Sequence, residues 1–241
     1  MLLTNKHEIE EAILNGKSIA KVIIAENKVI HAKFFSLLKQ AQIPLQRVPG
    51  EFIKNKYQIE TGIAALVEET KILSLDELLA LPTKRKFGRI LLADHIENPQ
   101  NLGAMIRTCA SFDFDGVILP DRRAAFVSEG VTKSSSGALF QIPIAKTHNL
   151  TLAIETLQKK EYWMVGTTLS SATTLNQIDT KRNLVIVMGN EDKGMHQKIV
   201  EQCDYLVRIP MSSSMQSLNV SVAFGIIAYE LFCKNQNESS I

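Results

Sequence analysis

The sequence has little of what marks secreted, membrane-spanning or metal-rich proteins. It holds only 3 cysteines and 1 tryptophan in 241 residues. Cys109, Cys203 and Cys233 are far apart and in apolar surroundings, so we expect buried free thiols and no metal site. No apolar run reaches the roughly 18 to 20 residues of a membrane span. The N-terminus turns charged before a signal-peptide core could form, so we expect a cytoplasmic protein with no membrane segment.

A large excess of one charge sign is also missing, because the net charge is only +2. Residues 1–88 carry 13 Lys+Arg against 10 Asp+Glu, and residues 89–241 carry 14 against 15. The chain is therefore not a polycation, and any contact with nucleic acid must use local patches. The candidates are "TKRKFGR" at 83–89, "DRR" at 121–123 and the lysine pair at 159–160. Each alone is also typical of an ordinary solvated face.

Common catalytic signatures are absent as well. The glycines form no dinucleotide-binding G-x-G-x-x-G, and no P-loop or metal-ligand spacing of His, Cys and Asp occurs. The 5 histidines do not pair with a nucleophilic serine or cysteine. The residues by themselves therefore name no reaction.

The first part of the chain reads as a small α/β unit. We expect helices at 6–16 and 29–42, strands at 21–25 and 44–48, and a turn at Pro49-Gly50. After "GIAALVEE", the stretch "LSLDELLALPTKRKFG" predicts a short helix, followed by a helix-breaking proline and a run of basic residues. We therefore expect a first domain over 1–75, a linker over 76–88 and a second domain over 89–241.

From Arg89 onward, apolar strands alternate with helices. Strands are expected at 89–94, 116–120, 140–145, 162–169, 183–189 and 205–210. Helices are expected at 99–111, 127–134, 150–161 and 196–203, and an apolar helix within 217–232. This alternation predicts a mainly parallel sheet with helices on both faces.

Polar clusters follow three of these strands, at the point where each strand ends. They are "ENPQNLGAMIRT" at 97–108, "GNEDKG" at 189–194 and "IPMSSSMQSLN" at 209–219. In the first, Asn98 suits a helix N-cap and Pro99 the first helical position. Ligands of such sheets bind beyond the carboxyl ends of the strands. Glycine and asparagine are also ordinary turn and capping residues, but three such clusters at one edge of the sheet favour a ligand-binding site.

These clusters resemble the motifs of the SpoU family of RNA ribose 2′-O-methyltransferases, in the α/β-knot superfamily. The motifs are "NPQNLGAMIRT", "VIVMGNEDKGM" and "RIPMSSSMQSLNVSVAFGIIAYE", with "SSSGALFQIPIA" between the first two. The first domain is similar to a ribosomal-protein-like RNA-binding domain. The resemblance implies S-adenosylmethionine as cofactor, a deep trefoil knot, and a homodimer with its active site near the subunit interface.

The resemblance also implies roles for residues that match the motifs. The implied catalytic residues are Asn101, Arg107, Glu191, Ser217 and Asn219. The implied cofactor-binding residues are Thr167, Gly189, Asn190, Ile209, Met211, Ser217 and Leu218. The sequence departs from the family at "SSSMQ", residues 212–216, where many members have a glycine-containing loop.

Arg107 lies one helical turn after Gly103. Helix side chains lean toward the N-terminus, so we expect its guanidinium to extend over Gly103 toward Asn101. There it could hold an RNA phosphate beside the anion-favouring helix start. Because the pKa of arginine exceeds about 12, we favour a positioning role over a base, with Glu191 orienting the guanidinium or accepting the proton.

The resemblance leaves the substrate open. The extra N-terminal domain favours ribosomal RNA, and transfer RNA is the alternative. A further alternative is an RNA-binding protein that keeps the fold without catalysis, although such a protein has no need of the five implied catalytic residues.

Overall fold

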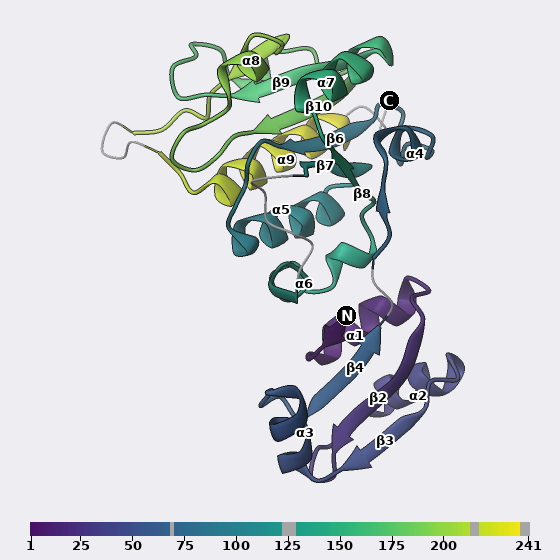
Figure 1. Cartoon of the computed structure of the whole chain (residues 1–241). Helices are drawn as coiled ribbons and strands as arrows, with labels where there is room; N and C mark the ends of the chain where they lie inside the picture. The colour runs from purple at the N-terminus through teal and green to yellow at the C-terminus, as the bar shows by residue number, and fades with distance from the viewer. Residues whose placement is uncertain (68–69, 122–128, 213–216, 237–241) are drawn as a thin grey trace.

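The computed structural model describes residues 1–67, 70–121, 129–212 and 217–236, and it contains two separate sheets (Figure 1). The first unit contains β1 (Leu2–Leu3), α1 (Lys6–Leu14), β2 (Ile19–Ala25), α2 (Ala32–Gln40), β3 (Leu45–Val48), α3 (Gly50–Tyr57) and β4 (Ile63–Val67). Its four strands lie in the order β1-β4-β2-β3, with β2 and β3 parallel and the other pairs antiparallel. Phe34 and Leu38 of α2 are among the side chains buried in its core.

The second unit carries the larger sheet. Its strands are β5 (Ile72–Leu73), β6 (Arg89–Ala93), β7 (Gly116–Pro120), β8 (Ile144–Thr147), β9 (Tyr162–Thr167), β10 (Asn183–Met188) and β11 (Tyr205–Val207). Its helices are α4 (Leu75–Leu79), α5 (Pro99–Ser111), α6 (Glu129–Ser135), α7 (Leu150–Lys159), α8 (Gln197–Val200) and α9 (Val220–Gln236), with 3₁₀ turns η1 (Ala138–Phe140) and η2 (Leu175–Gln177).

The strand order in this sheet is β11-β9-β10-β6-β7-β8-β5, and every neighbouring pair is parallel. Alternate residues of β6 point to opposite faces: Leu91 packs with α5 and α9, and Leu92 packs with α4, α7 and α8. The prediction of a parallel sheet covered by helices on both faces is therefore confirmed. All seven strands consequently end at the same edge of the sheet.

Several element predictions are wrong in detail. The helix α3 was not predicted, because among its residues only Ile53 is buried and no apolar period marks it. The strand expected at 140–145 begins only at Ile144. Phe140 instead lies in η1 and packs into the core of the first unit. Of the helix expected at 127–134, residues 127 and 128 lie outside the described part of the chain.

The change from one sheet to the other comes earlier in the chain than the boundary expected at 76–88. The strand β5 pairs with β8, although it falls within the expected first domain. The segment expected as a linker carries most of α4, which Ser74 and Glu77 begin with a capping box. Leu78 is buried against the large sheet. Residues from β5 onward therefore contribute to the core of the second unit.

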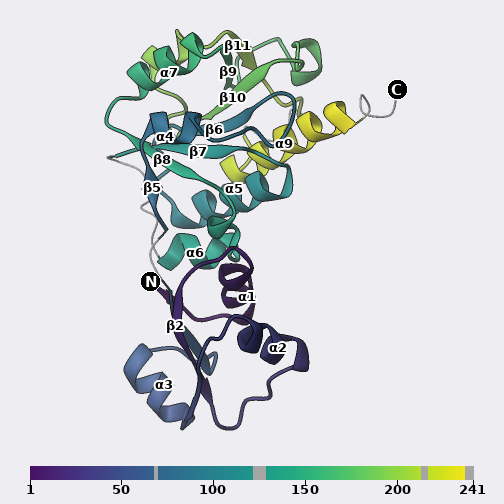
Figure 2. The ribbon, with the colours of Figure 1, turned by 90° about the vertical axis from the view of Figure 1, so that its right-hand side faces the viewer.

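The two units meet where α1 faces the turn after α6 (Figure 2). Gln141 Nε2 donates a hydrogen bond to Glu11 Oε2 at 2.5 Å. At Gly137, whose φ is +87°, a Cβ would lie 2.7 Å from the Cβ of Glu11. The first unit is thus joined to the second by close packing at η1. Among the described residues, no helix is both long and apolar enough to cross a membrane.

Candidate functional site

A cavity of about 430 Å³ lies at the carboxyl ends of β9, β10 and β11. Its walls come from the segment after β9, the loop after β10, the segment after β11 and the first turns of α9. Met188, Val207 and Ile227 give it an apolar floor, and Glu191, Asp192 and Lys193 give it a polar rim. All the residues expected to bind cofactor line this one cavity: Thr167, Gly189, Asn190, Ile209, Met211, Ser217 and Leu218. The structure therefore brings that set together, and its cofactor role stays a prediction.

The loop after β10 forms one wall of the cavity and is closed on itself. The backbone groups of Asn190 and Gly194 exchange two hydrogen bonds, at 3.0 and 2.9 Å. The Asn190 side-chain oxygen accepts from the backbone N–H groups of Asp192 and Lys193. A Cβ at Gly189 would lie 2.3 Å from the backbone of Gly194 and Met195, so only glycine fits there. This close approach fixes the position of Glu191.

A chain of side-chain hydrogen bonds joins the three motifs at the rim. Asn101 Nδ2 donates to Glu191 Oε1 at 2.6 Å, and Asn219 Nδ2 donates to Asn101 Oδ1 at 3.1 Å. Asn98 caps α5 and Pro99 occupies its first turn, as expected, which holds Asn101 at the start of the helix. Asn219 also accepts from Ser221 at the start of α9. Four of the implied catalytic residues therefore gather here, since Ser217 lines the cavity itself.

Arg107 does not take the direction expected from the sequence. Its Nη1 donates to Ser136 Oγ at 3.3 Å, and it lines a separate hollow between α1 and α5. The space over Gly103 is filled by α6, because a Cβ there would lie 1.8 Å from Ser134 Oγ. The expected path over Gly103 toward Asn101 is thus wrong. Arg107 is not among the described residues that line the cavity.

The basic stretch at 83–89 is only partly a surface patch. The Arg89 side chain is buried and donates to the backbone carbonyls of Gly88, Thr180 and Arg182. Burial lowers the pKa of Arg89 to about 10. Arg85 pairs with Asp113 at 2.6 Å. Lys84 and Lys86 remain exposed, as do the lysines at 159–160, whereas Arg122 and Arg123 lie outside the described residues.

Two of the three cysteine thiols are poor candidates for a nucleophile. All three cysteines are free, as expected, but only Cys109 is fully buried; the expected burial is wrong for Cys203 and Cys233, which are half-buried. Burial raises the pKa of Cys203 to about 12 and also raises that of Cys109. Both therefore stay protonated near neutral pH.

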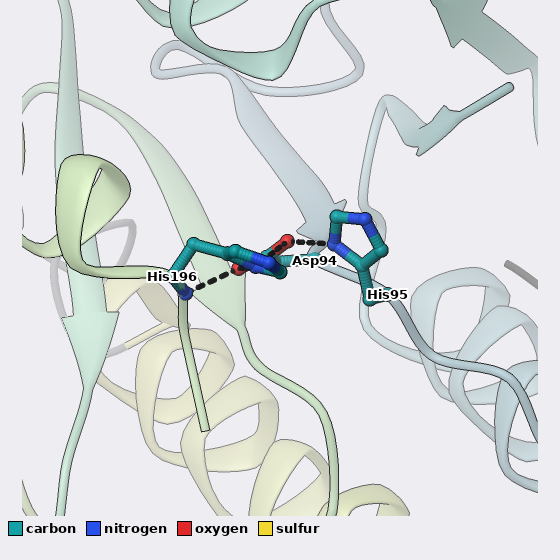
Figure 3. Close-up of side chains that lie close together, drawn as sticks. All are labelled: Asp94, His95 and His196. Atoms are coloured by element: carbon teal, nitrogen blue, oxygen red, sulfur yellow. Dashed lines mark hydrogen bonds and ion pairs between the residues drawn. The ribbon is translucent and has the colours of Figure 1, made fainter. Parts of the chain in front are cut away.

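One cluster of titratable side chains was missed at the sequence level. Asp94, His95 and His196 lie together beyond the end of β6 (Figure 3). His196 is about a hundred positions from the other two, so no local spacing signalled the cluster. The preference of ligands for strand ends was the only available signal.

Comparison with known proteins identifies the family. The model of the SpoU rRNA Methylase family matches residues 88–229. A protein of Staphylococcus saprophyticus named as a TrmH family tRNA/rRNA methyltransferase is 34% identical over 239 residues, which cover 97% of this chain and 96% of that protein.

Solved structures agree in fold. The SpoU methyltransferase AviRb of Streptomyces viridochromogenes, crystallised with AdoMet, superposes with a TM-score of 0.80 at 22% identity, covering 98% of this chain and 90% of that one. A structure described as an RNA 2′-O ribose methyltransferase also gives a TM-score of 0.80 at 22% identity, covering 98% and 89%. The chain belongs to the SpoU rRNA methylase family of RNA methyltransferases.

Proposed function

We propose that the protein transfers a methyl group from S-adenosylmethionine to the 2′-OH of a ribose in structured RNA, with ribosomal RNA as substrate, in the cytoplasm. The observation that carries this proposal is the convergence of all expected cofactor residues on one cavity whose rim holds the Asn101–Glu191 hydrogen bond. This arrangement places a ligand pocket beside groups that can orient a hydroxyl.

The cavity suits S-adenosylmethionine in size and character. Its volume of about 430 Å³ falls within the range of roughly 300 to 1,000 Å³ usual for small-molecule pockets. The apolar floor at Met188, Val207 and Ile227 can take the adenine, and backbone groups around Gly189 and Ile209 can take polar atoms. When bound, the cofactor supplies an electrophilic methyl group on a sulfonium.

The rim residues would position the acceptor hydroxyl. A ribose 2′-OH is a weak nucleophile, so holding it in line with the methyl group can lower the barrier by several kcal/mol. Asn101 fixes the Glu191 carboxylate through their 2.6 Å hydrogen bond. Glu191 would then orient the hydroxyl and accept its proton during methyl transfer.

We infer a homodimer from the surface of α9. Phe224, Ile227 and Leu231 are buried, while Val222, Ile226 and Tyr229 form an exposed apolar stripe on its other side. Such a stripe is typical of an interface. Because Arg107 lies outside the cavity of its own chain, we place it in the site of the partner subunit, where its planar guanidinium can hold phosphate and stabilise developing charge on the ribose oxygen.

Finer features of the fold belong to the same proposal. The strand β10 lies between β6 and β9, although β9 precedes it in the chain. We include in the proposal the deep trefoil knot that the family resemblance implies for the C-terminal part. We assign RNA recognition to the ribosomal-protein-like first unit, in line with the excess of positive charge in residues 1–88.

The test has a binding arm and a transfer arm. Calorimetry with S-adenosylmethionine should show one site per chain, and radiolabelled methyl groups should enter ribosomal RNA. Mapping 2′-O-methylation in RNA from a deletion strain then identifies the nucleotide. Labelling of transfer RNA alone would support the alternative substrate. Absence of cofactor binding at millimolar ligand would support a non-catalytic RNA-binding protein.

A further inference from the structure

Asp94, His95 and His196 form a compact cluster that the proposed methyl transfer does not use. The Asp94 side chain is 0% exposed, and its Oδ2 accepts a hydrogen bond from the backbone N–H of His196 at 2.8 Å. The His196 Nδ1 lies 3.2 Å from both carboxylate oxygens, and the His95 Nδ1 contacts Oδ1. Figure 3 shows the carboxylate between the His95 ring and the backbone nitrogen of His196.

The chemistry of this set matches a transition-metal site. Two imidazoles and one carboxylate are a known ligand set for zinc, with the remaining coordination positions taken by water. The ligand atoms of Asp94, His95 and His196 all lie within 4.8 Å of one another. The 3.2 Å between His196 Nδ1 and the carboxylate is close to the separation of about 3.3 Å expected for two ligands on tetrahedral zinc.

The cluster is held in place by the loop after β10. The backbone of His95 has a φ of +59°, in the left-handed region, where asparagine, aspartate and histidine are the side chains most often found besides glycine. Asn190 Nδ2 donates to the His95 carbonyl at 3.0 Å. Together with the His196 N–H bond to Asp94, this contact ties the end of β6 to both ends of the loop after β10. The ligands are therefore positioned before any ion arrives.

The cluster is also accessible. A hollow of about 590 Å³, separate from the cofactor cavity, is lined by His95 and His196 together with Asp121 and His148. The His196 side chain is 55% exposed. An ion can thus approach from solvent, and water can complete its coordination.

We propose that Asp94, His95 and His196 bind a divalent transition-metal ion of the zinc class. The ion bridges the end of β6 and the loop that carries Glu191. Binding therefore stabilises the folded chain, because an ion held by the native state alone shifts the unfolding equilibrium. This inference does not rest on methyl transfer, since its measurements need neither cofactor nor RNA.

The experiment uses the full chain after treatment with a chelator. Calorimetry with Zn²⁺ should show one site per chain, Co²⁺ should give a visible d–d absorption band, and Mg²⁺ should not bind. Zinc should also raise the melting temperature. His196→Gln and His95→Asn should each weaken zinc binding by about tenfold or more. Asparagine is chosen at 95 because it tolerates positive φ.

The matched control is His148→Gln. This histidine lines the same hollow and contacts Asp121, and its side chain is 97% exposed. Its replacement should leave zinc binding unchanged, and circular dichroism should confirm that every variant is folded. The proposal is overturned if zinc does not bind at millimolar concentration. It is also overturned if His148→Gln weakens binding as much as His196→Gln, or if both cluster variants bind like the unchanged protein.

Discussion

At Gly189, where the loop after β10 begins, the backbone packs closely against the end of the same loop. A Cβ added there would lie 2.3 Å from backbone atoms of Gly194 and Met195, and backbone cannot move aside as a flexible side chain can. Gly189→Ala should therefore distort this wall of the cavity and weaken S-adenosylmethionine binding by about tenfold or more, since a displaced backbone loses several ligand contacts at once. Calorimetry measures the affinity.

The control for this substitution is Gly50→Ala at the start of α3. A Cβ at Gly50 would meet only the Cβ of Ala25, at an ordinary 3.8 Å. This variant should bind the cofactor as the unchanged protein does. Equal affinities for Gly189→Ala and Gly50→Ala would show that the close approach in the loop is not needed for the cavity.

In the proposed mechanism, Arg107 serves catalysis and not cofactor binding. Its side chain lies outside the cavity, so Arg107→Ala should leave cofactor affinity unchanged. Turnover should fall by about a hundredfold or more, because the loss concerns a group that acts mainly in the transition state. Arg107→Lys should be nearly as inactive, since lysine keeps the charge but lacks the planar fork. Near-normal turnover of the lysine variant would show that charge alone suffices.

At the scale of the element, α9 carries two apolar faces. Its outer stripe consists of Val222, Ile226 and Tyr229, which are 50%, 40% and 59% exposed. Ile226→Glu should convert the proposed dimer to a 26.8 kDa monomer in light scattering at micromolar concentration, because burying an unpaired carboxylate at an interface is costly. Leu152→Glu on α7, where the leucine is 56% exposed, is the matched control and should stay dimeric. A dimeric Ile226→Glu variant would place the interface elsewhere.

At the scale of the whole molecule, a dimer permits a test of which subunit Arg107 serves. Arg107→Ala keeps an intact cavity, and Gly189→Ala keeps the arginine. If Arg107 acts in the partner's site, methyl transfer that is weak in either variant alone should return when the two are mixed and allowed to exchange subunits. No recovery in mixed dimers, verified by differential tags, would assign Arg107 to its own chain.

A second test at this scale asks whether the first unit binds RNA while the second binds the cofactor. Removal of residues 1–69 keeps β5 and α4, and with them the buried Leu78, in the large unit. This shortened chain should bind cofactor normally and lose affinity for RNA. The shortened chain should not begin at residue 89, because this would remove Leu78, which is buried in the core of the second unit. Unchanged RNA affinity after removal of the first unit would refute its role in recognition.

The sequence by itself determined the features that depend on neighbours along the chain. The cap at Asn98 and the proline after it predict the start of α5, and apolar runs predict the buried strands. Parallel strands all end at one edge, so the polar segments after β6, β10 and β11 could be placed together without knowing the strand order. The position of the cavity was therefore predictable.

Only the tertiary structure decided how distant segments meet. The packing of α6 against Gly103 turned Arg107 away, the burial of Arg89 removed it from the basic patch, and β10 beside β6 brought His196 to Asp94. The helix α3 escaped prediction for a related reason, since only Ile53 marks its buried side. Local propensity and periodicity act within a few turns or strands, whereas contacts across a hundred residues depend on which faces the whole chain buries.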